Sequence, residues 1–306
     1  MKKSSLLLVI FFSLAISSSA QYSKDFGVTL GVANYLGDVG GSKSVTQPWL
    51  LDMNLSRTRY SFGGFYRLNF TQKIAAKLSV NYARISGADS LSGIATQRAR
   101  NLSFRTDIIE ANIIAEYYFF TINNLSRASY TRIDFGSYIF AGGGVALFYP
   151  YAELDNKWYS LRPLKTEGVD NAYNEITAVL PVGAGANFTF NKQLKIGIEL
   201  GYRFTFTDYL DDISTRYAKE EDLPFWESVA LANRSAEAFR RGDAELQPLQ
   251  GFFAPGQPSR RGNPENNDGY FLGQISVSYT ITNRNAFSKA RYKSIIYKKR
   301  RTRSKF

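Results

Sequence analysis

Residues 194–207 read LKIGIELGYRFTFT, in which every even-numbered residue is large and apolar and every odd-numbered residue is charged, small or hydroxylic. Successive side chains leave a β-strand on opposite faces, so this period of two predicts a strand with one apolar and one polar face. Tyr202, Phe204 and Phe206 gather at one end of the apolar face, which is typical of the aromatic girdle of a lipid-facing barrel strand. A soluble barrel or sandwich is the alternative, although so aromatic an outer face would be a liability there.

Seven further segments repeat this two-residue period. They are residues 25–36, 58–70, 74–86, 106–120, 132–148, 175–190 and 269–282. Short links at 71–73 and 191–193, and one of about eleven residues after 120, alternate with long links. The long links are residues 37–57, 87–105, 149–174 and 209–268.

This alternation places all long loops at one end of a barrel and all short turns at the other, as in outer-membrane proteins. The sequence therefore predicts an all-β fold, an eight-stranded antiparallel transmembrane β-barrel with long extracellular loops and short periplasmic turns. A barrel of this type is expected to reside in the cell outer membrane, in contact with its lipid. The even number of strands predicts that both termini are periplasmic.

The first twenty residues have the layout of a secretory signal peptide. Lys2 and Lys3 precede an apolar run over residues 6–16, and Ser18-Ser19-Ala20 precedes Gln21. No later window of eighteen apolar residues predicts a membrane-spanning helix. The expected organisation is a signal peptide at 1–20, a barrel at 21–283 that includes the long loop 209–268, and a basic periplasmic tail at 284–306.

The chain contains neither cysteine nor histidine. Disulfides, thiolate chemistry, imidazole metal sites and histidine general bases are therefore absent. We expect a non-enzymatic protein with no catalytic residues, no cofactor and no metal. Asp208, Asp211 and Asp212 could be read as calcium ligands, since hard cations bind several oxygens. They lack the spacing of an established calcium loop, and a solvated strand end is the preferred interpretation.

The formal net charge of +12 is concentrated at the C-terminal end. Residues 21–283 contain 26 basic and 26 acidic side chains, whereas ten basic residues follow Asp268, the last acidic one. This distribution indicates an appended basic segment, and no nucleic-acid partner is expected. The predicted partner contacts are Arg291, Lys293, Lys298, Lys299, Arg300 and Arg301. A disordered tail, or one that binds lipid phosphates or peptidoglycan nonspecifically, is the alternative.

The polar faces of the strands carry a nearly balanced set of charges. These residues are Arg59, Arg67, Lys77, Lys195 and Arg203 with Glu110, Glu116, Asp134 and Glu199. Eight strands enclose a space that side chains fill, where isolated charges are too costly to keep. We predict a lumen charge network that forms a polar plug. Pro181 predicts a bulge or bend, and the spacing after Trp226 predicts a short surface helix within 227–241.

Three motifs stand at strand ends: GVANYLGD at 31–38, FTFTDYLDD at 204–212, and RGNP at 261–264 with NDGYF at 267–271. They resemble motifs of the PorG-like family of small outer-membrane barrels. The resemblance covers essentially the whole mature chain. It implies a non-enzymatic accessory role in type IX protein secretion and gliding motility in Bacteroidetes. It also implies periplasmic partners, the ring lipoprotein PorK and its partner PorN, which the barrel would anchor to the outer membrane.

Two classes of function follow from these expectations. The first is a structural protein that fixes a periplasmic assembly under the outer membrane, and the basic tail favours it. The second is a surface barrel that adheres to a ligand or another cell through its four long loops, with transport of small solutes as a more distant alternative.

Overall fold

The computed structural model describes residues 23–39, 57–123, 125, 132–169, 173–253 and 260–282. The expected signal peptide and the basic tail lie outside these residues. The strands are β1 (Ser23–Leu36), β2 (Arg59–Asn69), β3 (Ile74–Ala88), β4 (Ser103–Ile122), β5 (Ile133–Leu154), β6 (Lys157–Ser160), β7 (Ile176–Phe190), β8 (Leu194–Thr205) and β9 (Gly269–Thr282). The helices are α2 (Ala95–Arg100), α3 (Trp226–Ala232) and α4 (Ser235–Arg240), with 3₁₀ turns η3 (Asp89–Leu91), η4 (Arg162–Leu164), η5 (Glu220–Asp222) and η6 (Gln247–Phe253).

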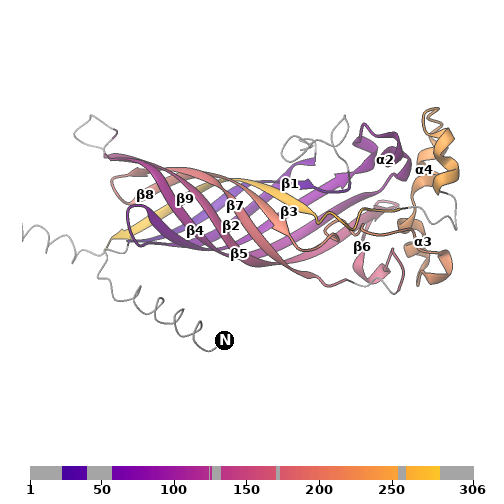
Figure 1. Ribbon diagram of the computed structural model, residues 1–306, viewed down its shortest axis with the longest axis horizontal. Helices are drawn as coiled ribbons and strands as arrows, with labels where there is room; N and C mark the ends of the chain where they lie inside the picture. Colours follow the sequence, from indigo (N-terminus) through magenta and orange to yellow (C-terminus); the bar gives the residue numbers. More distant parts are fainter. Residues whose placement is uncertain are drawn as a thin grey trace, which may run out of the picture.

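Eight strands close into an antiparallel barrel, as the sequence predicts. Each long strand pairs with its neighbour along the chain, and β9 returns to pair with β1 from Ser23↔Thr282 to Leu36↔Gly269. The strands are strongly tilted in Figure 1. The pairing of β4 with β5 closes the sheet, and closure is the condition for a sheet that stands in lipid.

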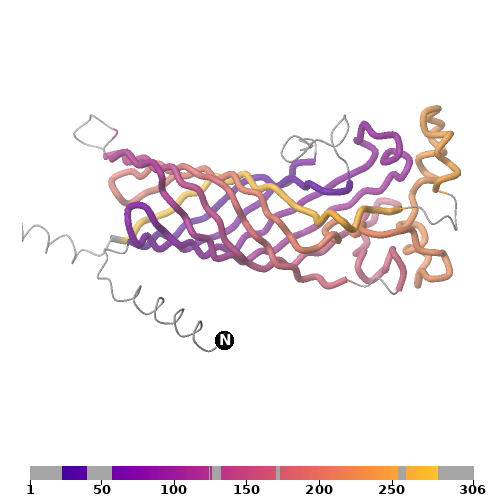
Figure 2. The backbone as a smooth tube through the Cα atoms, viewed as in Figure 1, coloured from indigo at the N-terminus to yellow at the C-terminus, as the bar shows by residue number. Residues whose placement is uncertain are grey.

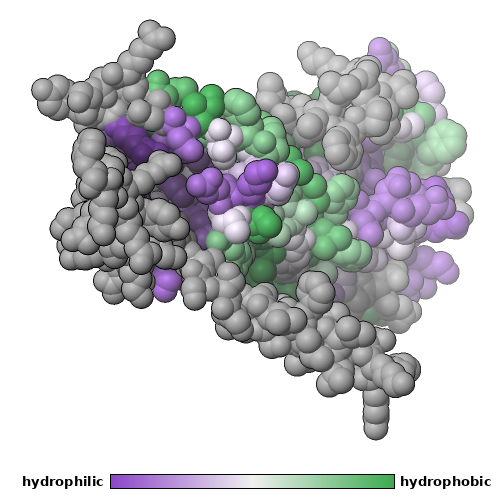
Figure 3. Space-filling model, turned by 60° about the vertical axis from the view of Figure 1, so that its left-hand side comes forward, coloured by the Kyte–Doolittle hydropathy of each residue, from purple (hydrophilic) through white to green (hydrophobic). Residues whose placement is uncertain are grey.

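The side chains alternate between the two surfaces of this wall in the predicted register. Outward residues such as Leu30 (67 % exposed) and Ile113 (69 %) are apolar, whereas inward residues such as Glu110 and Arg67 are at most 2 % exposed. In Figure 3 hydrophobic residues run along the visible side of the barrel, and hydrophilic ones are seen toward both of its ends. An apolar exterior around a polar interior is the architecture of a membrane β-barrel. In the part of the chain that the structure describes, the helices are too short or too polar to cross a membrane.

The two ends of the barrel differ. We call the end with α2, α3, α4 and β6 the loop end (Figure 1), and the opposite end the turn end. Residues 70–73 and 191–193 form tight connections at the turn end, where the first residue of β1 lies beside the last residue of β9 (Figure 2). The predicted segregation of long and short connections is therefore confirmed.

Three local features differ from the sequence-based expectations. The loop 149–174 is partly strand, because β5 continues to Leu154 and forms a hairpin with β6. The predicted helix is two helices, α3 and α4, separated at Asn233 and Arg234. The bulge predicted at Pro181 is not there: the register of β7 is unchanged across it, and only the pairs opposite Gly142 and Gly143 are lost. The register shift lies instead between Tyr118 and Phe120 of β4.

Glycines on the inner faces of β7 and β8 make room for an aromatic ring. Phe140 of β5 lies over them, and a Cβ atom added to Gly183 would lie 2.6 Å from its ring, one added to Gly201 2.8 Å. Only a residue without a side chain fits there. The glycine-rich strands thus allow large rings to fill a narrow lumen.

Candidate functional site

Four charged side chains from four strands meet at the centre of the lumen. Arg67 of β2 lies 2.8 Å from Glu116 of β4 and 3.3 Å from Glu199 of β8. Lys77 of β3 lies 2.6 Å from Glu199 and 3.5 Å from Glu116. The Tyr138 hydroxyl donates a hydrogen bond of 2.6 Å to Glu199. This central cluster holds two positive and two negative charges, so each buried charge has a partner of opposite sign.

A third ion pair continues the cluster toward the turn end. Lys195 Nζ lies 2.6 Å from Asp25 Oδ2, and Arg67 lies 3.8 Å from the same oxygen. The sequence-based set did not include Asp25, although it lies at an inward position, two residues before Gly27. With Asp25 and Lys195 added, the lumen charges near the centre are three positive and three negative.

A separate group lies closer to the loop end. Arg203 of β8 lies 3.5 Å from Glu110 of β4, which also accepts hydrogen bonds from Tyr270 (2.6 Å) and Asn81 (2.9 Å). Two of the nine predicted network residues are elsewhere. Asp134 pairs with Arg132 at 2.9 Å at the turn end, and Arg59 lines a pocket at the loop end. Both stand at the end of a strand, where an inward position is no longer enclosed by the barrel.

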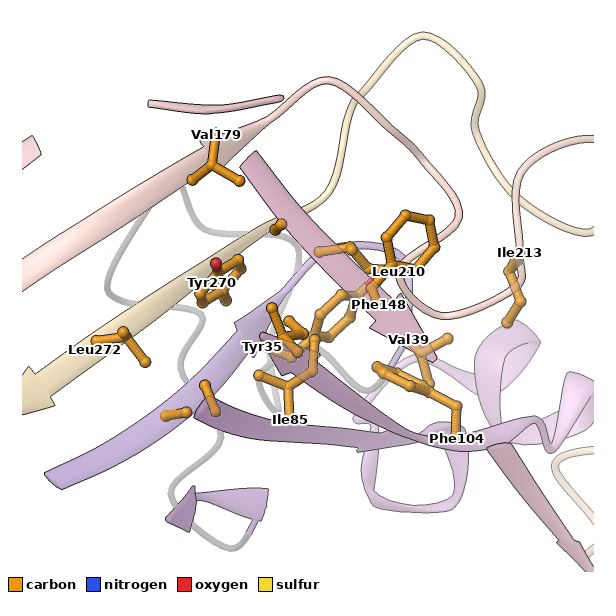
Figure 4. Packing of buried hydrophobic residues seen from close by; sticks show 14 of the residues in the cluster. Tyr35, Val39, Ile85, Phe104, Phe148, Val179, Leu210, Ile213, Tyr270 and Leu272 are labelled. Atoms are coloured by element: carbon orange, nitrogen blue, oxygen red, sulfur yellow. The ribbon is translucent and has the colours of Figure 1, made fainter. Parts of the chain in front are cut away.

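The mouth of the barrel at the loop end is filled by apolar side chains. Leu210, from the chain that follows β8, belongs to one buried cluster with the inward residues Ile85, Ile108, Phe148 and Val179. Figure 4 shows this cluster from close by. The Thr106 hydroxyl donates a hydrogen bond to the Leu210 carbonyl. Because these side chains are almost fully buried, the segment closes the mouth over the charged interior.

The three motifs that carry the family resemblance meet at this mouth. The Tyr35 hydroxyl lies 2.7 Å from Asp211 and 2.5 Å from Asp268, and so joins one residue of each motif. The main-chain N–H of Asn263 donates a hydrogen bond of 2.5 Å to Asp38. The motifs therefore have a structural role, which is to fasten the loops across the barrel.

A buried arginine holds the same region together. Arg261 lies 3.1 Å from Glu167 and 3.5 Å from Asp212, and its side chain is 2 % exposed. Glu167 also accepts hydrogen bonds from the main-chain N–H groups of Ser214 and Thr215. Nearby, Arg100 pairs with Asp89 at 2.7 Å and donates to the Arg261 carbonyl. We call the described residues 206–215 and 260–268, with Glu167 and Arg100, the loop cap.

The carboxylates of the loop cap are poor metal ligands as arranged. Asp211 accepts hydrogen bonds from Tyr35 and from the Ile213 N–H, while Asp212 accepts them from Thr166 and Tyr173. Among the residues that the structure describes, no group of three or more acidic side chains has an arrangement that could hold a metal ion. The calcium interpretation of the aspartates thus finds no support in their geometry.

Burial changes the acidity of these carboxylates. Desolvation raises the pKa of Asp208 to about 8 and that of Asp212 to about 6, the latter against the opposing charge of Arg261. Burial and the neighbouring aspartates raise the pKa values of Asp211 and Asp268 well above the usual range. Both oxygens of Asp208 are buried without a hydrogen-bond partner, which favours its protonated form.

The loop cap should loosen as the pH rises. A carboxyl whose pKa is raised on folding stabilises the fold fully below its unfolded pKa, near 3.8, and loses that contribution as the pH passes its folded pKa, about 8 for Asp208. Hydrogen exchange at the Leu210 amide, which donates to Asp268 at 3.0 Å, should therefore accelerate beyond its intrinsic pH dependence between about pH 4 and 8, and this extra acceleration should level off above pH 8. Asp208→Asn should remove much of this acceleration. The exposed Asp243→Asn is the matched control, and equal pH profiles for both variants would contradict the assignment.

Comparison with known proteins gives one family and several distant structural likenesses. No functionally curated protein matches the sequence. The outer membrane protein OprG of Pseudomonas aeruginosa is 11 % identical with a TM-score of 0.38, covering 86 % of this chain and 99 % of its own. Ail, the attachment invasion locus protein of Yersinia pestis, solved with the heparin analogue sucrose octasulfate, is 10 % identical with a TM-score of 0.34, covering 85 % and 99 %.

The N-terminal β-barrel domain of Pseudomonas aeruginosa OprF is 9 % identical with a TM-score of 0.31, covering 86 % of this chain and 98 % of its own. With TM-scores below 0.5, these likenesses do not bear on function. The family comparison is more extensive, since one family model matches residues 3–229, which include β1 to β8 and the first part of the loop after β8. The chain belongs to the family described as a domain of unknown function, DUF6089.

Proposed function

We propose that this protein is a non-enzymatic outer-membrane anchor that fixes a periplasmic assembly beneath the membrane. The observation that carries the proposal is a closed barrel whose lumen is filled with paired charges and whose mouth is covered by the loop cap. We expect such a barrel to offer no open path for a solute. Its binding surfaces are then the two ends, and the chain leaves the barrel after Thr282 at the turn end.

The specific assembly follows from the resemblance to the PorG-like family. In this proposal the turn end faces the periplasm, and the protein contacts the type IX secretion ring formed by PorK and PorN. The three resemblance motifs meet in one loop cap, where they have a structural role, so the proposed ring contact is based on the resemblance and on the basic tail. The basic tail, which lies outside the described residues, would supply charge contacts to an acidic partner through Arg291, Lys293, Lys298, Lys299, Arg300 and Arg301.

Reversal of four tail charges tests this proposal. Replacing Lys298, Lys299, Arg300 and Arg301 together by glutamate should strongly reduce recovery of the periplasmic ring proteins at low salt. The residual binding should be less sensitive to salt, because exposed charges are screened over about 8 Å at physiological ionic strength. The measurement is co-purification from membranes at low and high salt.

A charge-matched control separates the tail from net charge. The four exposed loop-end residues Lys157, Lys219, Arg240 and Arg260 would be replaced by glutamate in the same way. This control should retain the ring proteins. Equal recovery with the tail variant and wild type would contradict tail contact, and absence of ring proteins from the wild-type preparation would contradict the anchor itself. A reproducible conductance in planar bilayers would contradict the closed lumen and favour transport.

Adhesion through the loops is the second candidate function. The observation that favours it is a group of exposed aromatic residues at the loop end, Phe225, Trp226 and Phe252. Exposed rings of this size are common anchors of binding surfaces. Alanine at Trp226 and Phe252 should abolish attachment to cells or matrix if this function holds, and should leave recovery of the ring proteins unchanged if the anchor function holds.

A further inference from the structure

The wall of the barrel has a notch at its loop end. β2 begins at Arg59 and pairs with β3 only from Ser61, whereas β1 continues to Leu36 and β3 to Ala88. Among the described residues, no strand lies between β1 and β3 beyond the start of β2. A pocket of about 580 Å³ lies at this notch, and its lining includes residues of β1, β2, β3, β4 and β6.

The lining of this notch pocket is strongly basic. It contains Arg57, Arg59, Arg84 and Arg105, and its described lining residues include no acidic side chain. Arg84 alone is paired, with Asp107 at 2.5 Å. Within the described residues, no ion pair is formed by the other three arginines, Arg57, Arg59 and Arg105. Their three positive charges are therefore uncompensated in this part of the chain. Burial, and after it the charge of Arg59, lowers the pKa of Arg57.

Among the described residues, aromatic rings and not a counter-charge hold Arg105 in position. The Arg105 guanidinium lies over the ring of Trp158, 4.0 Å from its centroid, and 5.4 Å from that of Tyr151. Its Nε atom is buried and has no hydrogen-bond partner. A fixed guanidinium with an unused donor is suited to a ligand that brings oxygen acceptors, since the planar fork matches phosphate.

The pocket stands at the boundary of the apolar exterior. Along the paired strands β3 and β4, the last outward aromatic–aliphatic pair is Tyr82↔Ile109, and the next outward pair is Arg84↔Asp107. Tyr60, which lines the pocket, stacks on Tyr82 with ring centroids 6.1 Å apart. Aromatic rings followed directly by arginines are expected where hydrocarbon gives way to lipid headgroups.

We propose that the notch pocket binds the phosphorylated headgroup of a lipid in the leaflet on the loop side. Arg57, Arg59 and Arg105 would bind the phosphate oxygens, while the exposed side chains of Val32 and Tyr60 at the rim would contact the acyl region. A lipid fits these contacts better than a free phosphate, because the basic lining is continuous with the lipid-facing wall. The proposal is independent of the anchor function and of the side of the membrane on which the basic tail lies.

Retention of lipid by the full-length protein tests the proposal. The protein would be reconstituted in phosphatidylcholine nanodiscs with and without lipid A, released into detergent, and examined by native mass spectrometry for bound lipid. Wild type should retain lipid A in preference to phosphatidylcholine. Arg57→Gln combined with Arg105→Gln should weaken this retention by roughly thirty-fold, the change expected from removing two charge–phosphate contacts.

The matched control changes two arginines outside the pocket. Arg162→Gln combined with Arg240→Gln removes the same charge from the loop end and should retain lipid A like wild type. If the Arg57/Arg105 variant does not fold, Arg57→Gln alone serves, because it keeps the main-chain carbonyl that accepts a hydrogen bond from Ser86. It should weaken retention by roughly five-fold.

Two results would overturn the proposal. Equal retention by the pocket and control variants would show that the arginines do not bind the headgroup. Displacement of lipid A by millimolar inorganic phosphate, with phosphate bound equally well when no lipid A is present, would identify the pocket as a site for a free anion.

Discussion

Replacement of Glu199 by leucine should destabilise the barrel by about 3–5 kcal/mol, which is the cost of leaving buried charges without a partner. Glu199 is the carboxylate nearest to Lys77, at 2.6 Å, and it also lies 3.3 Å from Arg67. Its removal leaves one positive charge in excess in a lumen where these side chains are at most 5 % exposed. The measurement is the midpoint of unfolding in urea for the protein in lipid. Unfolding is monitored by the change in electrophoretic mobility between the folded and the unfolded barrel.

A second substitution should reverse part of this loss. Lys77→Met together with Glu199→Leu leaves Arg67 paired with Glu116, and Lys195 paired with Asp25, so the lumen is neutral again. The double variant should therefore be more stable than Glu199→Leu alone. Glu175→Leu is the control, since it breaks the exposed pair with Arg162 and should cost less than about 1 kcal/mol. An unchanged midpoint for Glu199→Leu would place that carboxylate in water.

Replacement of Arg261 by methionine should open the loop cap while the barrel stays folded. The substitution leaves Glu167 and Asp212 buried without their common cation, which should cost the cap about 3–5 kcal/mol. The loss is local, because the strands pair independently of Arg261. Proteolysis within residues 209–268 should then accelerate by roughly a hundred-fold to several thousand-fold when opening is in fast equilibrium.

The control is Arg162→Met, which removes an exposed arginine from the same end of the barrel. It should leave the rate of cleavage close to that of wild type. Both variants should keep the mobility of the folded barrel. If Arg261→Met is cleaved no faster than the control, the cap is held by its apolar contacts around Leu210, and the buried ion pairs add little.

Much of the fold can be predicted from the sequence because a membrane barrel obeys a simple rule. The side chains of each strand point alternately to the lipid and to the lumen. The period of two in a stretch such as 194–207 therefore determines that the stretch is a strand and which of its side chains point into the lumen. The lengths of the links determine which end carries the loops. The helical region was predicted less well, since Asn233 and Arg234 interrupt the helix through contacts with distant segments, such as that of Arg234 with the carbonyl of Glu153.

The individual contacts of the candidate sites were decided only by the tertiary structure. The alternation places Arg67, Lys77 and Glu199 inside, but their pairing depends on the register of strands that lie more than a hundred residues apart. Asp25 belongs to the network and Arg59 does not. Closure of β9 on β1 fixes how far each residue of a tilted strand lies from the two ends of the barrel, and the sequence of one strand does not give that distance. The loop cap and the notch pocket likewise join segments from the whole chain, and only closure of the barrel brings those segments together.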